Sequence, residues 1–198
     1  MSDDRSAPLV VLVAFGSVRR ERAGIGLARA LVRAIEGRGH RALLADPAEI
    51  ELPMLDRMYK EHELGTAPEP MERLAGMIRE AHAVIVVCAE YNHSAPPALV
   101  NMLDHYLEEW AGKPAGICTY SAGRFGGVRA LSTLRMMLAE LGMPTVPTIL
   151  PVPTVGKAFT PEGGVADERI ERSIDRFLHD LVWWAEAARD RRARETAP

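Results

Sequence analysis

The sequence predicts an α/β fold in which helices cover both faces of a parallel sheet. Short runs of apolar, often β-branched residues alternate with segments whose apolar residues recur at helical spacing. Breaks rich in glycine, proline or polar residues separate the two kinds of segment. Such alternation requires right-handed crossover connections, so consecutive strands lie parallel in one sheet. We therefore expect three layers, with the sheet between two layers of helices.

Five segments have the pattern of strands. Pro8 to Phe15 is continuously apolar, which is typical of a central parallel strand buried on both faces. The segment 40–45 is shorter and more polar, which favours a place nearer an edge of the sheet. The other strands are expected at 83–88, 115–120 and 145–150.

Helical periodicity separates these strands. From Glu21 to Arg38 the apolar residues lie on one face of a helix and arginines lie opposite, and glycines follow as stop signals. The stretch 46–70 has four prolines and no clean period, so no structure is predicted for it. A loop of this length in a compact domain is usually functional. Further helices are expected at 71–81, 96–110, 128–141 and from 167 to about 192.

Five strands joined by helices suit the flavodoxin-like order 2-1-3-4-5, in which the loops after strands 1, 3 and 4 meet at one end of the sheet. The 198 residues suffice for one domain with a sizeable core. We expect that domain over residues 8–192, a flexible N-terminal tail over 1–7 and a C-terminal tail over 193–198.

The composition limits the classes of binding partner and the cellular compartment that we expect for this protein. The net charge of -3 gives no argument for nucleic acid or for an anionic membrane surface. No apolar run approaches the roughly 18 residues that a membrane-spanning helix needs. Cys88 and Cys118 lie near the ends of apolar runs, so they are interpreted as small buried hydrophobes rather than a disulfide or a metal pair. Reduced thiols and the lack of a signal-peptide pattern indicate the cytoplasm.

The loop after the first strand has the features of an anion site. Ser17 offers a hydroxyl, Arg19 and Arg22 offer planar guanidinium groups, and free amides are expected where the next helix begins, near Gly24. A glycine–serine turn followed by a solvated basic helix face is the alternative, but the place directly after the first strand favours binding. The spacings G-x-G-x-x-G and G-x-x-x-x-G-K-[ST] are missing, which disfavours a Rossmann or a Walker-type site.

The loop after the third strand is polar and aromatic. Tyr91 and Asn92 can stack on and hydrogen-bond a flat heteroaromatic ring, and backbone groups from Glu90 onward can address its polar edge. His93 invites a catalytic role, but no nucleophile or carboxylate is placed to work with it. We therefore expect a structural or solvent-facing histidine and no catalytic side chain.

The loop after the fourth strand is rich in glycine, which lets backbone amides approach a ligand closely. Ser121, Gly123, Gly126 and Gly127 are the candidates here, and a flexible surface loop is the alternative. Arg129 and Arg135 are interpreted as surface or interface charges. Together the three loops predict a site for a mononucleotide with a flat ring, and no metal-ligand cluster or Ser/His/Asp order competes with this interpretation.

Four segments together resemble the NADPH-dependent FMN reductase family, whose flavodoxin-like members include azo-dye, quinone and chromate reductases. They are GSVR at 16–19, EYNHSAPPALVN at 90–101, YSAGRFGGVRA at 120–130 and LPVPTVGKAF at 150–159. Ala89 stands where the family usually has proline and Val100 where it usually has lysine. The resemblance implies FMN held at its phosphate by Ser17, Arg19 and Arg22, along its isoalloxazine by Glu90, Tyr91 and Asn92, and at its pyrimidine edge by Ser121, Gly123, Gly126 and Gly127.

The resemblance also implies a ping-pong reaction. NADPH or NADH passes a hydride to FMN, and the electrons then go to a flavin, a quinone, an azo compound or a metal oxyanion. The alternative is a flavodoxin-type electron carrier that binds FMN and does not itself oxidise NAD(P)H. Such carriers tend to be strongly acidic, so the net charge of -3 favours the reductase.

Family members are typically homodimers or dimers of dimers, and the helix patterns also suggest an interface. More apolar surface is expected than one sheet face covers, which often marks an interface. We expect the loop 54–65, of the same chain or of the partner subunit, to cover the open face of the flavin. The residues assigned to the interface are Met102, Tyr106, Trp110, Met136, Met137, Trp183 and Trp184.

Overall fold

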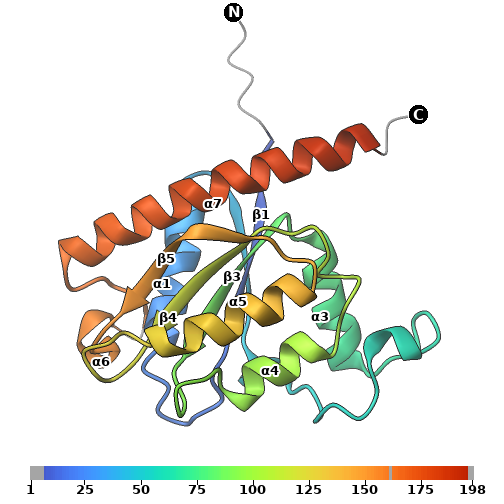
Figure 1. The fold of residues 1–198 in the computed structure, drawn as a ribbon, viewed down its shortest axis with the longest axis horizontal. Coiled ribbons are helices and arrows are strands. Elements are labelled where there is room, and N and C mark those ends of the chain that lie inside the picture. The colour runs from blue at the N-terminus through green and yellow to red at the C-terminus, as the bar shows by residue number, and fades with distance from the viewer. Residues whose placement is uncertain (1–6, 161, 196–198) are drawn as a thin grey trace, which may run out of the picture.

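Five parallel strands form the centre of the computed structural model, which describes residues 7–160 and 162–195 (Figure 1). The strands are β1 (Val10–Phe15), β2 (Arg41–Ala45), β3 (Ala83–Ala89), β4 (Ala115–Tyr120) and β5 (Thr145–Val152). Their order is β2-β1-β3-β4-β5 and every neighbouring pair is parallel, which confirms the predicted topology.

Burial of the strands follows their place in the sheet. β3 and β4 are buried along their whole length and β1 from Val11 onward, as their continuous apolar runs require. β2 and β5 form the two edges, and both contain exposed and partly buried residues. Pro147 and Pro151 lie in β5, where an edge strand tolerates a missing N–H donor.

Long helices alternate with the strands, and short helical turns lie in the loops. None of the helices in residues 7–160 and 162–195 is long and apolar enough to cross a membrane. The long helices are α1 (Ile25–Glu36), α3 (Glu69–Glu80), α4 (Pro97–Asp104), α5 (Leu131–Glu140) and α7 (Glu168–Glu195). The short ones are α2 (Pro47–Ile50), α6 (Val155–Ala158) and the 3₁₀ turns η1 (Tyr59–Glu61) and η2 (Val128–Ala130).

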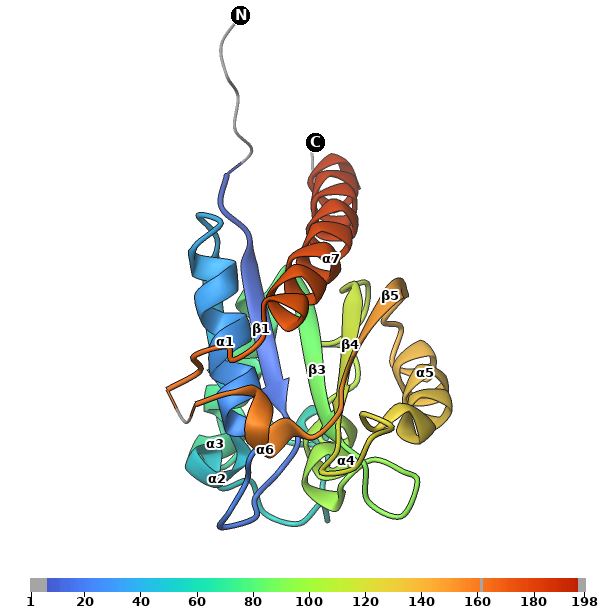
Figure 2. The same cartoon turned by 90° about the vertical axis from the view of Figure 1, so that its left-hand side faces the viewer.

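The helices form two hydrophobic layers, and Figure 2 shows α1 and α5 on opposite sides of the sheet. Leu31 of α1 and Phe177 of α7 belong to one layer, together with Val13 of β1. Leu103 of α4 and Leu138 of α5 belong to the other layer, with the strand residues that point the opposite way. This alternation of strand side chains fills both faces and leaves the strand ends free for polar loops.

The stretch 46–70, for which the sequence predicted no structure, is fastened to α4. The side chain of Asn101 accepts a hydrogen bond from the Leu55 amide at 2.9 Å and donates one to the Pro53 carbonyl at 2.8 Å. The Tyr59 amide donates to the His105 carbonyl at 2.8 Å. Asn101, the last residue of the EYNHSAPPALVN segment, therefore has a structural role.

The predicted helix at 96–110 was too long, because α4 ends at Asp104 and turns follow. Tyr106 and Trp110 fold inward, and Tyr59 packs on Tyr106 with 5.4 Å between ring centroids. Met102, Tyr106 and Trp110 are fully buried within this chain, so assigning them to a subunit interface was wrong. Met136, Trp183 and Trp184 are exposed, and Met137 is half-buried.

The structure bears differently on the two tails that the sequence predicted. The N-terminal tail lies outside the described residues except for Ala7. At the other end, α7 continues to Glu195, so residues 193–195 are helical rather than part of a tail.

Candidate functional site

The loops that follow β1, β3 and β4 meet at the carboxyl end of the sheet, which is the lower end in Figure 2. Backbone hydrogen bonds join their starts: the Gly16 amide donates to the Val87 carbonyl at 3.0 Å, and the Glu90 amide donates to the Tyr120 carbonyl at 3.2 Å. A cavity of about 340 Å³ opens between the loops. Small-molecule sites usually have volumes of roughly 300 to 1,000 Å³, so this cavity falls in their range.

Residues from all three loops line this strand-end cavity. The predicted site residues that it brings together are Ser17, Arg19, Arg22, Glu90, Tyr91 and Ser121. The lining residues that the sequence reasoning missed are Glu21, Ala23, Ala89, Tyr120, Ala122 and Val155. Ala89 and Tyr120 are the last residues of β3 and β4, so strand ends could have suggested them, whereas Val155 follows a strand whose loop had no predicted role.

One end of the cavity gathers groups suited to an anion. Ser17 is 2% exposed, and its hydroxyl lies 3.3 Å from the hydroxyl of Tyr91 and accepts a 3.4 Å hydrogen bond from the Arg19 amide. The guanidinium of Arg22 lies 5.7 Å from the centroid of the Phe15 ring. A hydroxyl, a backbone amide and two arginines thus come from one loop, and such donors suit a phosphate.

Asp46 is a member of this region that the sequence reasoning missed. It directly follows β2, is 1% exposed and forms an ion pair with Arg22. Its Oδ1 also accepts a 3.0 Å hydrogen bond from the Ala48 amide, which caps α2. Its Oδ2 has no partner in the part of the chain that the structure describes. An aspartate immediately after a predicted strand was the only sequence signal for it.

Tyr91 is held by a tight turn. Tyr91 and Ser94 exchange backbone hydrogen bonds of 2.9 and 3.0 Å, and Asn92 and His93 between them have φ angles of 51° and 65°. Two left-handed residues in a two-residue loop define a type I′ turn. His93 is exposed, as expected. Asn92 is exposed and does not line the cavity, so its role at the ring stays a prediction.

Glu90 ties the second loop to the third. Its two carboxylate oxygens accept hydrogen bonds of 3.1 Å from the backbone amide and the guanidinium of Arg129. The same guanidinium lies 4.4 Å from the centroid of the Phe125 ring. Arg129 is exposed, as expected of a surface charge, and in addition it links η2 to the loop after β3.

Two of the predicted glycines, Gly24 and Gly127, pack closely against Tyr120. A Cβ atom on Gly24 would lie 2.2 Å from the Tyr120 ring, and one on Gly127 would lie 2.7 Å from the Tyr120 carbonyl. Gly126 and Gly127 both have positive φ, 63° and 79°. Gly123 is exposed and has open space around it. None of these four lines the cavity, and their contact with a cofactor stays a prediction.

Burial controls the protonation of the groups beneath the cavity. Burial raises the pKa of the Tyr120 hydroxyl, and burial together with nearby Glu90 raises the pKa of the Cys88 thiol to about 12. Tyr120 and Cys88 are therefore protonated at neutral pH, and Cys88 and Cys118 are both free and buried. Cys88 is no nucleophile under these conditions.

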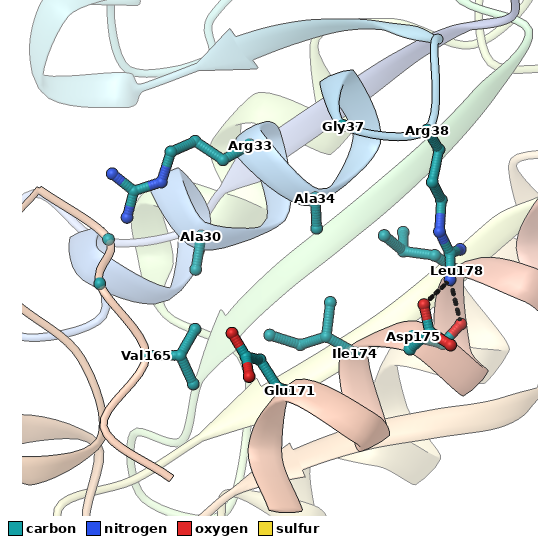
Figure 3. A pocket seen from close by; sticks show the side chains of 12 residues that line it. Ala30, Arg33, Ala34, Gly37, Arg38, Val165, Glu171, Ile174, Asp175 and Leu178 are labelled. Carbon is teal, nitrogen blue, oxygen red and sulfur yellow. Dashed lines mark hydrogen bonds and ion pairs between the residues drawn. The ribbon is translucent and has the colours of Figure 1, made fainter. Parts of the chain in front are cut away.

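A larger hollow of about 500 Å³ lies between α1 and α7 (Figure 3). Ala30 and Ala34 of α1 face Ile174 of α7 across it, and Arg38 pairs with Asp175 at one end. Its charged side chains are exposed or half-buried, and none of the predicted site residues lines it.

Comparisons with known proteins agree with the resemblance. A family model described as NADPH-dependent FMN reductase matches residues 9–156. A quinone reductase of Pseudomonas putida is 30% identical over 187 residues, which cover 90% of this chain and 96% of that protein. A quinone reductase of Escherichia coli is 33% identical over 140 residues, covering 69% of this chain and 72% of that protein.

Solved structures agree on the fold. A flavoenzyme NAD(P)H:(acceptor) oxidoreductase from Paracoccus denitrificans superposes with a TM-score of 0.75 at 27% identity, covering 91% of this chain and 98% of that one. A flavodoxin variant from Pseudomonas aeruginosa superposes with a TM-score of 0.55 at 21% identity, covering 87% of this chain and 99% of that one. The second likeness reflects the shared flavodoxin-like fold alone.

Proposed function

Because the chain belongs to the NADPH-dependent FMN reductase family, we propose that its FMN-dependent oxidation of NAD(P)H serves to reduce quinones. Family membership favours this reductase over a flavodoxin-type electron carrier without NAD(P)H oxidation. The observation that supports the location of the reaction is the strand-end cavity, where Ser17 and Arg22 converge beside Tyr91.

The residues around the cavity fit FMN. In our proposal Ser17, Arg19 and Arg22 hold the phosphate, because a buried hydroxyl, an amide and two guanidinium groups suit a dianion. Glu90, Tyr91 and Asn92 line the isoalloxazine. Bound FMN supplies the redox chemistry, accepting a hydride from NAD(P)H and passing electrons to the acceptor.

The glycine loop has a separate task in this proposal. Ser121, Gly123, Gly126 and Gly127 lie at the pyrimidine edge of the ring, where backbone amides stabilise developing negative charge. The Ser121 hydroxyl donates to the Gly123 carbonyl at 3.0 Å, and the left-handed glycines after it set the course of the loop. No side chain needs to transfer a proton in this scheme, since the redox chemistry belongs to the flavin.

Quinones are our choice of acceptor because the relatives support them. The proteins named above from Pseudomonas putida and Escherichia coli are quinone reductases. A flavin, an azo compound or a metal oxyanion would use the same exposed ring face, so the acceptor has to be tested directly. The same test distinguishes NADPH from NADH as the electron donor.

We also propose a homodimer, or a dimer of dimers, in the cytoplasm. The exposed Met136, Trp183 and Trp184 support an interface, because exposed apolar side chains that gather on a surface often mark one. The free, buried Cys88 and Cys118 suit a reducing compartment. Sedimentation at micromolar concentration should give at least the mass of a dimer, and a monomer alone would contradict the assembly.

The reaction is tested with purified protein saturated with FMN and then freed of unbound flavin. Anaerobic NADPH or NADH should bleach the flavin absorbance, and a quinone should restore it faster than an azo dye, chromate or free FMN. If no flavin is retained at any concentration, the cavity assignment fails. If bleaching occurs and a quinone reoxidises the flavin no faster than the other acceptors, the choice of acceptor fails.

A further inference from the structure

Asp46 is a buried carboxylate that the function proposed above leaves unused. Ala45, the residue before it, is the register partner of Ala14 in β1, so Asp46 lies beside the loop that follows β1. With 1% exposure it has lost its hydration, and a buried charge is retained only where a partner compensates it. Its partner is Arg22, 24 residues earlier in the chain.

The contacts of Arg22 fix its guanidinium. One terminal nitrogen, Nη1, donates both to the carboxylate of Asp46 and to the Ser17 carbonyl, the latter at 3.5 Å. The guanidinium also lies over the Phe15 ring. A guanidinium carries five N–H donors. The three on Nε and Nη2 have no partner within the described residues, and Arg22 lines the strand-end cavity.

The carboxylate itself is rigid. Asp46 Oδ1 accepts the Ala48 amide at the start of α2, so the side chain is anchored to the backbone while it holds Arg22. Net charge does not explain this arrangement, because Asp46 cancels the positive charge that attracts a phosphate. Orientation explains it, because an arginine side chain loses much rotamer entropy when a ligand orders it, and a side chain ordered in advance avoids that loss.

We propose that Asp46 is a positioning residue for FMN: it orders Arg22 so that the free N–H donors of the guanidinium are directed to the phosphate. The proposal rests on the FMN site proposed above. It predicts that Asp46 affects ligands only through their phosphate group.

The experiment compares FMN with riboflavin, which lacks the phosphate, by fluorescence titration of the apoprotein. Asp46→Asn keeps the size of the side chain and an acceptor for the Ala48 amide but removes the charge. The dissociation constant for FMN should rise about 10-fold, since a charge-assisted hydrogen bond is lost, and that for riboflavin should stay unchanged. Asp46→Ser also keeps a helix-capping hydroxyl, cannot reach Arg22 and should give the same pattern.

Two further variants sharpen the result. In the Arg22→Gln background, Asp46→Asn should cause no additional loss of FMN affinity, because the residue acts through Arg22. Asp175→Asn makes the same chemical change in the exposed ion pair with Arg38, and it should leave both ligands unaffected. Thermal unfolding of each apoprotein shows that the variants fold.

Three results would overturn the role of Asp46: tighter FMN binding in Asp46→Asn, equal weakening of FMN and riboflavin, or additive losses in the double variant. The first would mean that Asp46 only cancels charge, and the second that it only supports the fold. If the unmodified protein binds FMN and riboflavin equally well, the phosphate site itself is wrong, which is a separate failure of the proposed function.

Discussion

The strand-end cavity and the hollow between α1 and α7 differ in the kind of residue that each one buries. The hollow between α1 and α7 is the larger, about 500 Å³ against about 340 Å³, and it presents short side chains and solvated charges such as Asp175. The strand-end cavity adjoins Ser17 and Asp46, which are both almost fully buried. Left-handed residues, including Asn92 and Gly127, shape the loops beside it.

The difference teaches that buried polarity identifies a site better than volume does. Burying a carboxylate or holding a residue in a left-handed conformation lowers the stability of the fold. Such features are expected where a ligand benefits from them. The α1–α7 hollow buries no carboxylate, because its ion pair between Arg38 and Asp175 remains in contact with solvent, although Gly163 in its lining also has a positive φ, 88°.

The largest effect is expected at the ion pair beside the strand-end cavity. Arg22→Gln leaves the buried Asp46 without its cationic partner, so the free energy of unfolding of the apoprotein should fall by about 4 kcal/mol. Urea denaturation of the apoprotein measures this value. An unchanged midpoint and slope would mean that Asp46 is solvated, and the contrast between the two hollows would then disappear.

The next effect concerns the glycine loop. Gly127→Ala combines a φ of 79° with a Cβ atom 2.7 Å from the Tyr120 carbonyl, so it should destabilise the protein by about 3 kcal/mol. Gly39→Ala is the matched control, because its φ is 80° and no atom lies within 4 Å of its Cβ position. Gly39→Ala should lower the free energy of unfolding by only about 1 kcal/mol. Equal costs in thermal unfolding would show that the close approach to Tyr120 is unimportant.

Stability at alkaline pH should depend on the buried thiol beneath the strand-end cavity. Unfolded cysteine loses its proton near pH ~8.5, whereas burial raises the pKa of Cys88 to about 12. The unfolded state therefore binds fewer protons between these values, and stability falls as pH rises through that window. At pH 10 this thiol should lower the free energy of unfolding by about 2 kcal/mol relative to neutral pH.

Denaturation at pH 7 and pH 10 measures this loss. Cys88→Ala should lose less stability over that range than the unmodified protein, and Cys118, whose pKa burial also raises, accounts for part of what remains. Identical losses in both proteins would contradict the buried thiol as the cause.

The smallest effect is expected in the α1–α7 hollow. Arg38→Gln breaks an ion pair in which Asp175 is 78% exposed, so the free energy of unfolding should change by less than about 1 kcal/mol. FMN affinity should not change. A clear loss of FMN binding in this variant would mean that the hollow communicates with the strand-end cavity, and the distinction drawn between them would be wrong.

Periodicity in the chain was enough to predict the strands, their order and the loops that form the site. Continuous apolar runs such as the one ending at Phe15 specify buried parallel strands, because both of their faces must be covered. Helical crossovers then bring the loops with Ser17, Tyr91 and Ser121 to one end. These features depend on local patterns and on general rules of topology, so one sequence suffices to infer them.

Such patterns do not predict which side chains far apart in the chain come into contact. The pairing of Arg22 with Asp46 and the burial of Trp110 depend on how loops pack, as does the bond between Glu90 and Arg129. An isolated arginine or tryptophan in a sequence carries no sign of whether it will face solvent or a partner. That outcome is set by the packing of segments far apart in the chain, which becomes definite only when the tertiary structure forms.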